Sequence, residues 1–263
     1  ADFSDVGGLT LVSDAAVSPD NRLRLTPAVG GMEGAAWYSA GKQVVALPFE
    51  TTFQFQLSEN FDAPGGSDGF VLILQNTDPA FLSGGGGTLG YNALPNSLAV
   101  EFDTFQNAEA GDPSHSHISV HTNGTGSNGW FESLSLGSYS TIPDLLDDAA
   151  VHTAKIAYTT GSLSIYLDDL TTPKLTVAVD LHRTLALDAG RSWVGFTATT
   201  GGGYQNHDIL NWSFQGGDDL IIADNASVLE GAGGSTSPVA FTVHRVGSLA
   251  GQAVVNWTTA DGT

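Results

Sequence analysis

Apolar and polar residues alternate with a period of two along most of the chain, and clusters of Gly, Asn, Asp, Ser and Pro separate these runs. Apolar residues at helical spacing are almost absent. Neighbouring side chains on a strand point to opposite faces, so this alternation predicts strands with one buried face. The pattern therefore predicts an all-β fold made of antiparallel sheets packed as a sandwich.

Four segments refine this prediction. Residues 52–57 alternate polar and apolar side chains, which indicates a strand with one face in the core. The run FVLIL at 70–74 is apolar throughout and predicts a strand covered on both faces. Residues 154–167 predict a β-hairpin that turns at Gly161. The only helix candidate is short, at 142–150.

The most informative segment for function is LAVEFDTFQNAEAGDPSHSHISV, at 98–120. The alternation places Glu101 and Asp103 on one face of a strand and the apolar Val100 and Phe102 on the other. Neighbouring carboxylates that are partly shielded from water share a proton or hold a cation, because desolvation and like-charge repulsion both oppose two unpaired negative charges there. The segment is therefore a candidate metal site.

The spacing continues beyond the strand. The candidate ligands stand at steps of 0, +2, +4, +6, +11 and +16, and are Glu101, Asp103, Phe105 (through its backbone carbonyl), Asn107, Asp112 and His117. Carboxylates with an imidazole suit a first-row ion such as Mn²⁺, whereas carboxylates with amide and carbonyl oxygens suit Ca²⁺. A two-metal site fits this inventory; the alternative is an acidic surface strand followed by a polar loop.

Length and composition limit the other possibilities. At 263 residues and 41% hydrophobic, the chain can fill one large β domain. Composition shifts near Gly216, which predicts a domain at 1–216 and a segment at 217–263 with too few strands for a separate core. The formal charge of −20 disfavours nucleic acid and anionic membranes. With no cysteine, stability must come from packing and bound ions. The amino terminus lacks signal-peptide features, so a secreted protein would be in its mature form.

Five ordered blocks lead to a family. They are GAAWYSAGKQVV, SDGFVLILQN, SGGGGTLGY, NSLAVEFDTFQN with DPSHSHISV, and WVGFTATTGGGYQNHDILNWSF. In these blocks, over about residues 2–215, the chain resembles the legume-type (L-type) lectins. The resemblance implies a concanavalin-like jelly-roll sandwich that binds sugar beside a Mn²⁺ and Ca²⁺ pair and performs no chemistry.

The resemblance also implies roles for single residues. Mn²⁺ would be held by Glu101, Asp103, Asp112 and His117, and Ca²⁺ by Asp103, the Phe105 carbonyl, Asn107 and Asp112. The sugar-binding residues would be Asp68, Gly87, Phe105, Asn107, Gly202, Gly203 and Tyr204. The bond between Ser67 and Asp68 would be cis. His207 and Asp208 are expected to be structural, and His115 and His121 are expected to be ordinary polar residues and not ligands.

The resemblance to L-type lectins also predicts which sugar is bound and where the protein acts. The loop TTGGGYQNHD at 199–208 is similar in length to that of the pea and lentil lectins, which favours mannose or glucose. The segment after 217 resembles the first half of a Calx-β repeat, in which Glu230 and Asp261 are candidate Ca²⁺ ligands. A lectin domain before such a repeat predicts a bacterial surface or secreted adhesin that binds glycans, with its oligomeric state left open.

Two alternatives remain at this point. Laminarinase-like glycoside hydrolases carry an E-x-D-x-E strand, and VEFDTF begins the same way. A retaining hydrolase needs two carboxyl groups about 5 to 5.5 Å apart, however, and Phe105 stands where the second one is required. A calcium-dependent structural spacer without a sugar site is the other alternative. The presence of both Asp68 and Asn107 argues against it.

Overall fold

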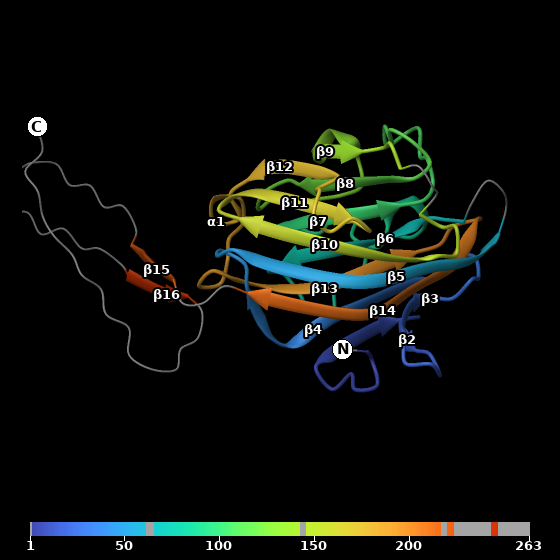
Figure 1. Ribbon diagram of the computed structural model, residues 1–263, viewed down its shortest axis with the longest axis horizontal. Coiled ribbons are helices and arrows are strands. Elements are labelled where there is room, and N and C mark those ends of the chain that lie inside the picture. Colours follow the sequence, from blue (N-terminus) through green and yellow to red (C-terminus); the bar gives the residue numbers. More distant parts are fainter. Residues whose placement is uncertain (1, 62–65, 143–145, 217–219, 224–242, 247–263) are drawn as a thin grey trace, which may run out of the picture.

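Two seven-stranded antiparallel sheets face each other in the computed structural model, which describes residues 2–61, 66–142, 146–216, 220–223 and 243–246 (Figure 1). The expected all-β jelly-roll sandwich is confirmed. The first sheet contains, in spatial order, β1 (Leu9–Ser13), β4 (Glu33–Val44), β13 (Arg191–Thr199), β6 (Gly69–Gln75), β7 (Ser97–Asp103), β8 (His117–Thr122) and β9 (Ser135–Tyr139).

The second sheet packs against the inner face of the first. It contains, in spatial order, β12 (Leu175–Val179), β11 (Gly161–Leu167), β10 (Val151–Thr159), β5 (Phe49–Phe61), β14 (Tyr204–Gly216), β3 (Leu23–Thr26) and β2 (Ala16–Val17). The predicted hairpin is confirmed as β10 and β11, and Gly161 at its turn has a φ of 89°. Only glycine adopts this backbone conformation without a steric penalty.

Aromatic rings fill the space between the sheets. Phe53 of β5 meets three rings of the first sheet edge to face: Phe70 at 6.0 Å, Phe102 at 5.6 Å and Phe196 at 5.1 Å between ring centroids. Phe70 and Phe102 are register partners on β6 and β7, and their rings stack at 4.9 Å. The alternation predicted for 52–57 therefore places Phe53 at the centre of the core.

A second apolar layer covers the outer face of the first sheet. All seven residues of β6 are buried, as the run at 70–74 predicts. Val71 and Ile73 point away from the sandwich core and pack with Leu89, Tyr91 and other residues of the segment that crosses over β6. This segment begins with a glycine-rich stretch that includes the 3₁₀ turn η1 (Gly86–Thr88). Packing of Leu89 and Tyr91 therefore fixes the glycine-rich loop against the end of β6.

Helical structure differs from the expectation. The described part of the predicted helix at 142–150, residues 146–150, contains turns and no helix, so this prediction is wrong there. A helical turn, α1 (Leu181–Thr184), follows β12 instead, and the side chain of Asp180 caps it by accepting from the backbone N–H groups of His182 and Arg183. With the 3₁₀ turn η2 (Glu132–Leu134), the described ranges hold only three- and four-residue helical turns, none with the length or hydropathy of a membrane span.

The predicted Calx-β segment falls mostly outside the described residues. Within 217–263 the structure describes one antiparallel pair, β15 (Leu220–Ala223) with β16 (Val243–Val246). Glu230 and Asp261 lie outside the described residues. The division of the chain into 1–216 and 217–263 and the Calx-β resemblance remain predictions.

The core arrangement predicts a large cost for removing the central ring. Phe53→Ala should lower the free energy of unfolding by about 3 to 5 kcal/mol, because it deletes a fully buried phenyl group that three rings contact. Phe131→Ala, a matched change at a side chain that is 45% exposed, should cost less than about 1 kcal/mol. Urea unfolding of both variants measures the difference, and equal costs would contradict this description of the core.

Candidate metal and ligand site

The outward face of β7 carries two buried carboxylates. Glu101 and Asp103 are 2% and 3% exposed, and they share this face with Ala99. Leu98, Val100 and Phe102 point the other way into the core, as the alternation predicts. A strand buried on both faces therefore holds two acidic side chains beneath the loops that cover the first sheet.

Three of the predicted metal ligands converge at the end of β7. One donor atom from each of Asp103, Asp112 and His117 lies within 4.8 Å of the other two. Asp103 ends β7 and is the register partner of His117 at the start of β8. The His117 Nδ1–H donates to the Ser114 carbonyl at 3.0 Å, whereas Nε2 is buried without a hydrogen-bond partner. A histidine held this way presents its second nitrogen to a metal.

The loop after β7 folds back over these ligands. Asp103 accepts a hydrogen bond from the Phe105 backbone N–H at 2.7 Å, and Asp112 accepts one from the Asn107 backbone N–H at 2.5 Å. The side-chain Oδ1 of Asn107 is buried and has no hydrogen-bond partner. These contacts bring an amide oxygen next to two carboxylates, as a Ca²⁺ site requires.

Burial makes this carboxylate cluster unfavourable without a positive charge. Burial, with repulsion from Glu101, raises the pKa of Asp103 well above its ordinary value. Burial also raises the pKa of Asp112 to about 7, although the hydrogen bond from Asn107 opposes the shift. Burial lowers the pKa of His117, which favours the neutral, metal-binding imidazole. The donor set, the free His117 Nε2 and the free Asn107 Oδ1 thus fit the Mn²⁺ and Ca²⁺ pair that the resemblance implies.

Asp68 stands beside this cluster at the start of β6. The peptide bond between Ser67 and Asp68 is cis, as the resemblance implies. The Asp68 backbone is fixed on both sides, because its N–H donates to the Thr199 carbonyl at 3.2 Å and its carbonyl accepts from the Thr104 N–H at 3.0 Å. Its side chain is 5% exposed, and Oδ2 has no hydrogen-bond partner. Burial raises the pKa of Asp68 to about 7.

His207 and Asp208 have the structural roles that the sequence predicts. The His207 Nε2 accepts from the Gly69 N–H at 3.1 Å, next to Asp68, while Nδ1 lies 2.6 Å from the Thr26 hydroxyl. Burial lowers the pKa of His207 to about 3, so the ring stays neutral and can accept this hydrogen bond. Asp208 forms a bidentate ion pair with Arg24, with both N–O distances at 2.7 Å. These contacts hold the turn before β6 in place.

Two glycine-rich loops enclose Asp68 and Asn107. A Cβ placed on Gly87 would lie 2.4 Å from the Asn107 Oδ1, and one on Gly201 would lie 3.2 Å from the Asp68 Oδ2. A Cβ on Gly203 would lie 2.6 Å from the Ser67 hydroxyl. The loops therefore approach both side chains more closely than a larger residue would allow. A Cβ on Gly202 meets nothing within 4 Å.

Aromatic side chains flank this region. Phe105 lies in the loop after β7 and is 42% exposed. Its ring and the His115 ring are arranged edge to face, with 6.4 Å between their centroids. Tyr204 stacks on Phe61 at 4.5 Å with an interplanar angle of 15°. The predicted sugar-contacting rings are thus accessible, and Tyr204 is backed by a second ring that the sequence analysis did not identify.

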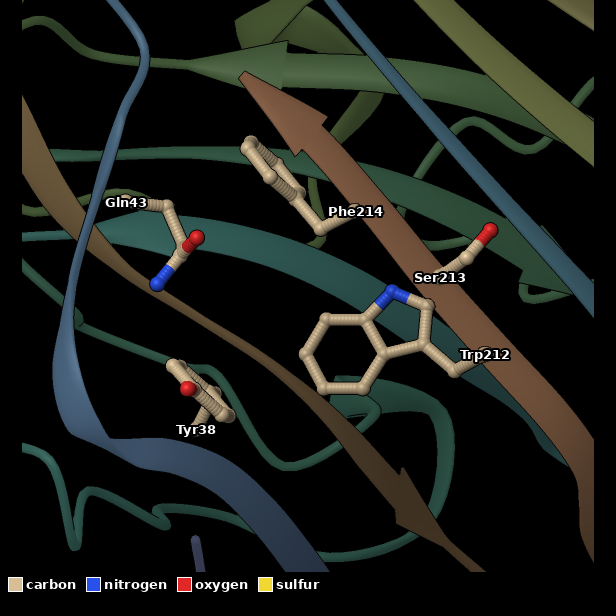
Figure 2. Close-up of a pocket in the computed structure, with 5 residues that line it drawn as sticks. All are labelled: Tyr38, Gln43, Trp212, Ser213 and Phe214. Carbon is tan, nitrogen blue, oxygen red and sulfur yellow. The ribbon is translucent and has the colours of Figure 1, made fainter. Parts of the chain in front are cut away.

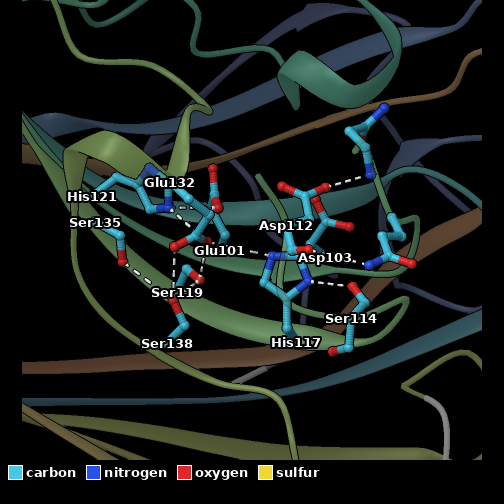
Figure 3. Close-up of polar contacts among 12 residues, drawn as sticks. Glu101, Asp103, Asp112, Ser114, His117, Ser119, His121, Glu132, Ser135 and Ser138 are labelled. Atoms are coloured by element: carbon cyan, nitrogen blue, oxygen red, sulfur yellow. Dashed lines mark hydrogen bonds and ion pairs between the residues drawn. The ribbon is translucent and has the colours of Figure 1, made fainter. Parts of the chain in front are cut away.

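Glu101 departs from the expected grouping (Figure 3). It lies with His121 and Glu132 in a second group whose donor atoms are within 4.8 Å of one another, and not with Asp103, Asp112 and His117. His121 Nε2 is 3.1 Å from a Glu101 oxygen and 3.5 Å from a Glu132 oxygen.

The expectation that His121 is a polar residue and not a metal ligand stays a prediction, and the structure places this ring between two carboxylates. Burial alone would lower the pKa of His121, but the Glu101 and Glu132 carboxylates outweigh it and raise this pKa to about 10. His117 and His121 share one face of β8, because an even spacing along a strand returns side chains to the same side. The position of Glu132 depends on the path of the loop after β8 and has no comparable signal in the sequence.

A separate cavity of about 220 Å³ lies between β4 and β14 (Figure 2). It is lined by Tyr38, Gln43, Trp212, Ser213 and Phe214. Trp212 follows Tyr204 by eight positions along β14, a distance of roughly 26 Å along an extended strand. The cavity has no charged lining residue and is not part of the Asp68 region.

Comparisons with known proteins agree with this geometry. Residues 4–212 match the family model described as the legume lectin beta-barrel domain. The basic agglutinin of Psophocarpus tetragonolobus is 32% identical over 234 residues, which cover 78% of this chain and 89% of that protein. Favin of Vicia faba is 34% identical over 215 residues, which cover 73% of this chain and 83% of favin.

Solved structures show the same fold. The basic winged bean lectin with Tn-antigen has a TM-score of 0.64 at 31% identity, covering 81% of this chain and 94% of that one. The Bauhinia forficata lectin in complex with GalNAc has a TM-score of 0.66 at 25% identity, with the same two coverages. The chain therefore belongs to the legume lectin family of non-enzymatic carbohydrate-binding proteins.

Proposed function

We propose that the chain binds a pyranose ring through Asp68, Asn107 and the backbone of Gly87, Gly202 and Gly203, with two metal ions organising the loop after β7. The observation that carries this proposal is a pair of buried acceptors without hydrogen-bond partners, Asp68 Oδ2 and Asn107 Oδ1, enclosed by the two glycine-rich loops. Buried polar atoms without partners are rare in folded proteins, and at a binding site a ligand satisfies them.

The metal ions would be held by residues already gathered around Asp103. Ca²⁺ would take Asp103, Asp112, the Phe105 carbonyl and Asn107 Oδ1, while Mn²⁺ or another first-row ion would take Asp103, Asp112, His117 and one oxygen of Glu101. The ions supply positive charge that stabilises the ionised carboxylates. Asn107 then keeps its NH₂ group free to donate to a sugar hydroxyl.

Asp68 supplies the charged acceptor. An ionised carboxylate can accept hydrogen bonds from two adjacent sugar hydroxyls, and such bonds are about twice as strong as neutral ones. The pKa of about 7 that burial gives Asp68 is lowered by a nearby cation. Sugar binding therefore depends on the metal ions through both the charge of Asp68 and the position of Asn107.

The family excludes the hydrolase alternative and favours a lectin over a spacer. For the sugar, we retain mannose or glucose, which the length of the 199–208 loop supports. Galactose or N-acetylgalactosamine is the second candidate. It is supported by relatives described as bound to GalNAc or Tn-antigen and by the 2-acetamido-2-deoxy-D-galactose-binding seed lectin 2 of Cytisus scoparius, which is 30% identical.

The proposed setting is extracellular or exoplasmic, within a secreted or surface protein. It is consistent with relatives described as seed lectins, such as that of Styphnolobium japonicum. The role in an adhesin rests on the sequence resemblance alone, and the relatives give no support for a bacterial source.

Removing the metal ions should abolish sugar binding. After chelation with EDTA, calorimetry with mannose and with N-acetylgalactosamine should show no heat, and adding Ca²⁺ with Mn²⁺ should restore binding to the preferred sugar. At free metal 100 times above Kd, the ions should also stabilise the fold by about 2.7 kcal/mol. Undiminished sugar binding by the stripped protein would exclude the metal-dependent site, and no binding in either state would support the spacer.

Replacing Asp68 should remove binding without unfolding the protein. Asp68→Asn should weaken the preferred sugar at least about 100-fold, because each hydrogen bond to a charged acceptor contributes about 1.5 to 3 kcal/mol. Asp188→Asn provides a matched control, since the Asp188 side chain is 68% exposed and lies on the surface in an ion pair with Lys42. Glycan-array binding with circular dichroism as a folding check measures both, and wild-type binding by Asp68→Asn would reject this assignment.

A methyl group on Gly87 should disturb Asn107. In Gly87→Ala the added Cβ would overlap the Asn107 amide, so sugar affinity should fall by about tenfold or more, equivalent to about 1.4 kcal/mol. Gly41→Ala is the control, because a Cβ there meets nothing within 4 Å. Comparable affinities of the two variants in calorimetry would show that the 85–87 loop does not define the sugar site.

A further inference from the structure

Glu101, His121 and Glu132 form a compact group, and the proposed Mn²⁺ and Ca²⁺ pair uses only Glu101 of the three. His121 extends from β8 beside Ser119, which is the register partner of Glu101 on β7. Glu132 approaches from η2, the 3₁₀ turn after the loop that follows β8 (Figure 3). His121 is fully buried, and its Nε2 has no hydrogen-bond partner although it points toward both carboxylates.

We propose that these three side chains bind a further transition-metal ion of the Zn²⁺ class, separate from the ion at Asp103, Asp112 and His117. In a tetrahedral zinc site, each ligand atom lies about 2.0 to 2.2 Å from the ion. Two ligand atoms of the same site are therefore about 3.3 to 3.6 Å from each other. The Nε2 of His121 is 3.1 Å from Glu101 Oε2 and 3.5 Å from Glu132 Oε1, close to these separations. One imidazole and two carboxylates leave a fourth position for water.

Each ligand is also oriented by a hydrogen bond from outside the group. The His121 Nδ1–H donates to the Gly129 carbonyl at 3.1 Å, which directs Nε2 at the carboxylates. The buried Tyr91 hydroxyl donates to Glu101. Glu132 accepts from Ser119 at 2.6 Å and from Ser138 at 2.8 Å. Such outer contacts are typical of protein metal ligands.

A neutral imidazole nitrogen cannot rest between two carboxylates, because its lone pair is repelled by both. Either a proton or a metal ion must lie there. The Nε2 atom is buried without a hydrogen-bond partner, although it lies 3.1 Å from one carboxylate oxygen and 3.5 Å from another. His117 shows the same arrangement, with Nδ1 bonded to a carbonyl and Nε2 free, at a position that the metal pair explains. The matching geometry favours an ion at His121 as well.

The ligand set selects the class of ion. Ca²⁺ takes six to eight oxygen ligands, whereas an imidazole with two carboxylates suits zinc or a similar first-row ion. Glu101 can serve both metal groups, because a carboxylate has two oxygens and can bridge two ions. Glu132 Oε1 lies 3.8 Å from His117 Nε2, so the two metal groups are direct neighbours.

Metal counting tests this proposal on the full chain. The protein is stripped with EDTA, equilibrated with Zn²⁺ and Ca²⁺, dialysed, and analysed by mass spectrometry of the metals. Zinc should occupy both transition-metal groups, which gives two zinc ions per wild-type chain. Glu132→Gln and His121→Gln should each retain one. Glu50→Gln, a matched change at a side chain that is 50% exposed, should retain two.

Several results would overturn the proposal. One zinc per wild-type chain would show that a proton, and not a metal, lies between the carboxylates. Two zinc ions in both variants would place the extra ion elsewhere, and none in Glu132→Gln would mean that the two groups form a single site. Co²⁺ gives an independent readout, since wild type but not Glu132→Gln should add a second set of intense four-coordinate absorption bands.

Sugar calorimetry separates this proposal from the proposed function. With Ca²⁺ and Mn²⁺ present, Glu132→Gln should bind sugar like wild type, because Asp68 and Asn107 are unchanged. A failure of sugar binding by the wild-type protein would contradict the lectin site and leave the zinc count unaffected. If His121→Gln does not fold, Glu132→Gln carries the test.

Discussion

Repulsion among buried carboxylates on one face of β7 is the constraint on which the functional region depends. Two like charges 4 Å apart repel by about 4 kcal/mol at an effective dielectric constant of 20, and a whole domain is stable by only about 5 to 15 kcal/mol. Glu101 and Asp103 are both almost fully buried, and Asp112 joins them from the loop. The chain must therefore neutralise this face with protons or with cations. The neutral His117 ring and the unpaired side-chain oxygen of Asn107 can each donate an electron pair to a cation, but neither supplies a positive charge of its own. Neutralisation by metal ions is therefore favoured over neutralisation by protons.

Apolar packing and the polar site are joined through the layer over the first sheet. Leu89 and Tyr91 pack on Val71 and Ile73, and this contact fixes the glycine-rich loop that closes on Asn107. The hydroxyl of the same Tyr91 donates to Glu101. One buried aromatic residue thus links the apolar layer, the glycine-rich loop proposed to face the sugar, and the carboxylate of Glu101, so a change in packing there reaches all three. This explains why β6 must be apolar on both faces.

The sequence predicted those parts of the site that depend on local spacing. Alternation along β7 placed Glu101 and Asp103 on one face, as predicted, and the structure shows that the register of β7 with β8 brings the candidate ligand His117 opposite Asp103. The all-β fold and the hairpin at Gly161 follow from equally local patterns. Glu132 could not be predicted, because its contact with His121 depends on the path of a loop that alternation does not specify. The short helix was placed wrongly at 142–150, because its acidic and apolar residues suit a turn equally well; α1 forms instead where Asp180 supplies a cap.

Strand register and loop chemistry have different functions in this molecule. Asp103 and His117 lie opposite each other at the paired ends of β7 and β8, where the backbone ladder fixes their separation, as coordination requires. Asp68, Asn107 and the glycines lie on loops held by single hydrogen bonds such as Gly69 to His207, where residues can change without altering the sheets. A cation bound between the two regions would transmit the precision of the strands to the loops. Metal affinity is then set by the sheet, whereas the choice of sugar is set by the loops, and the two properties can vary independently.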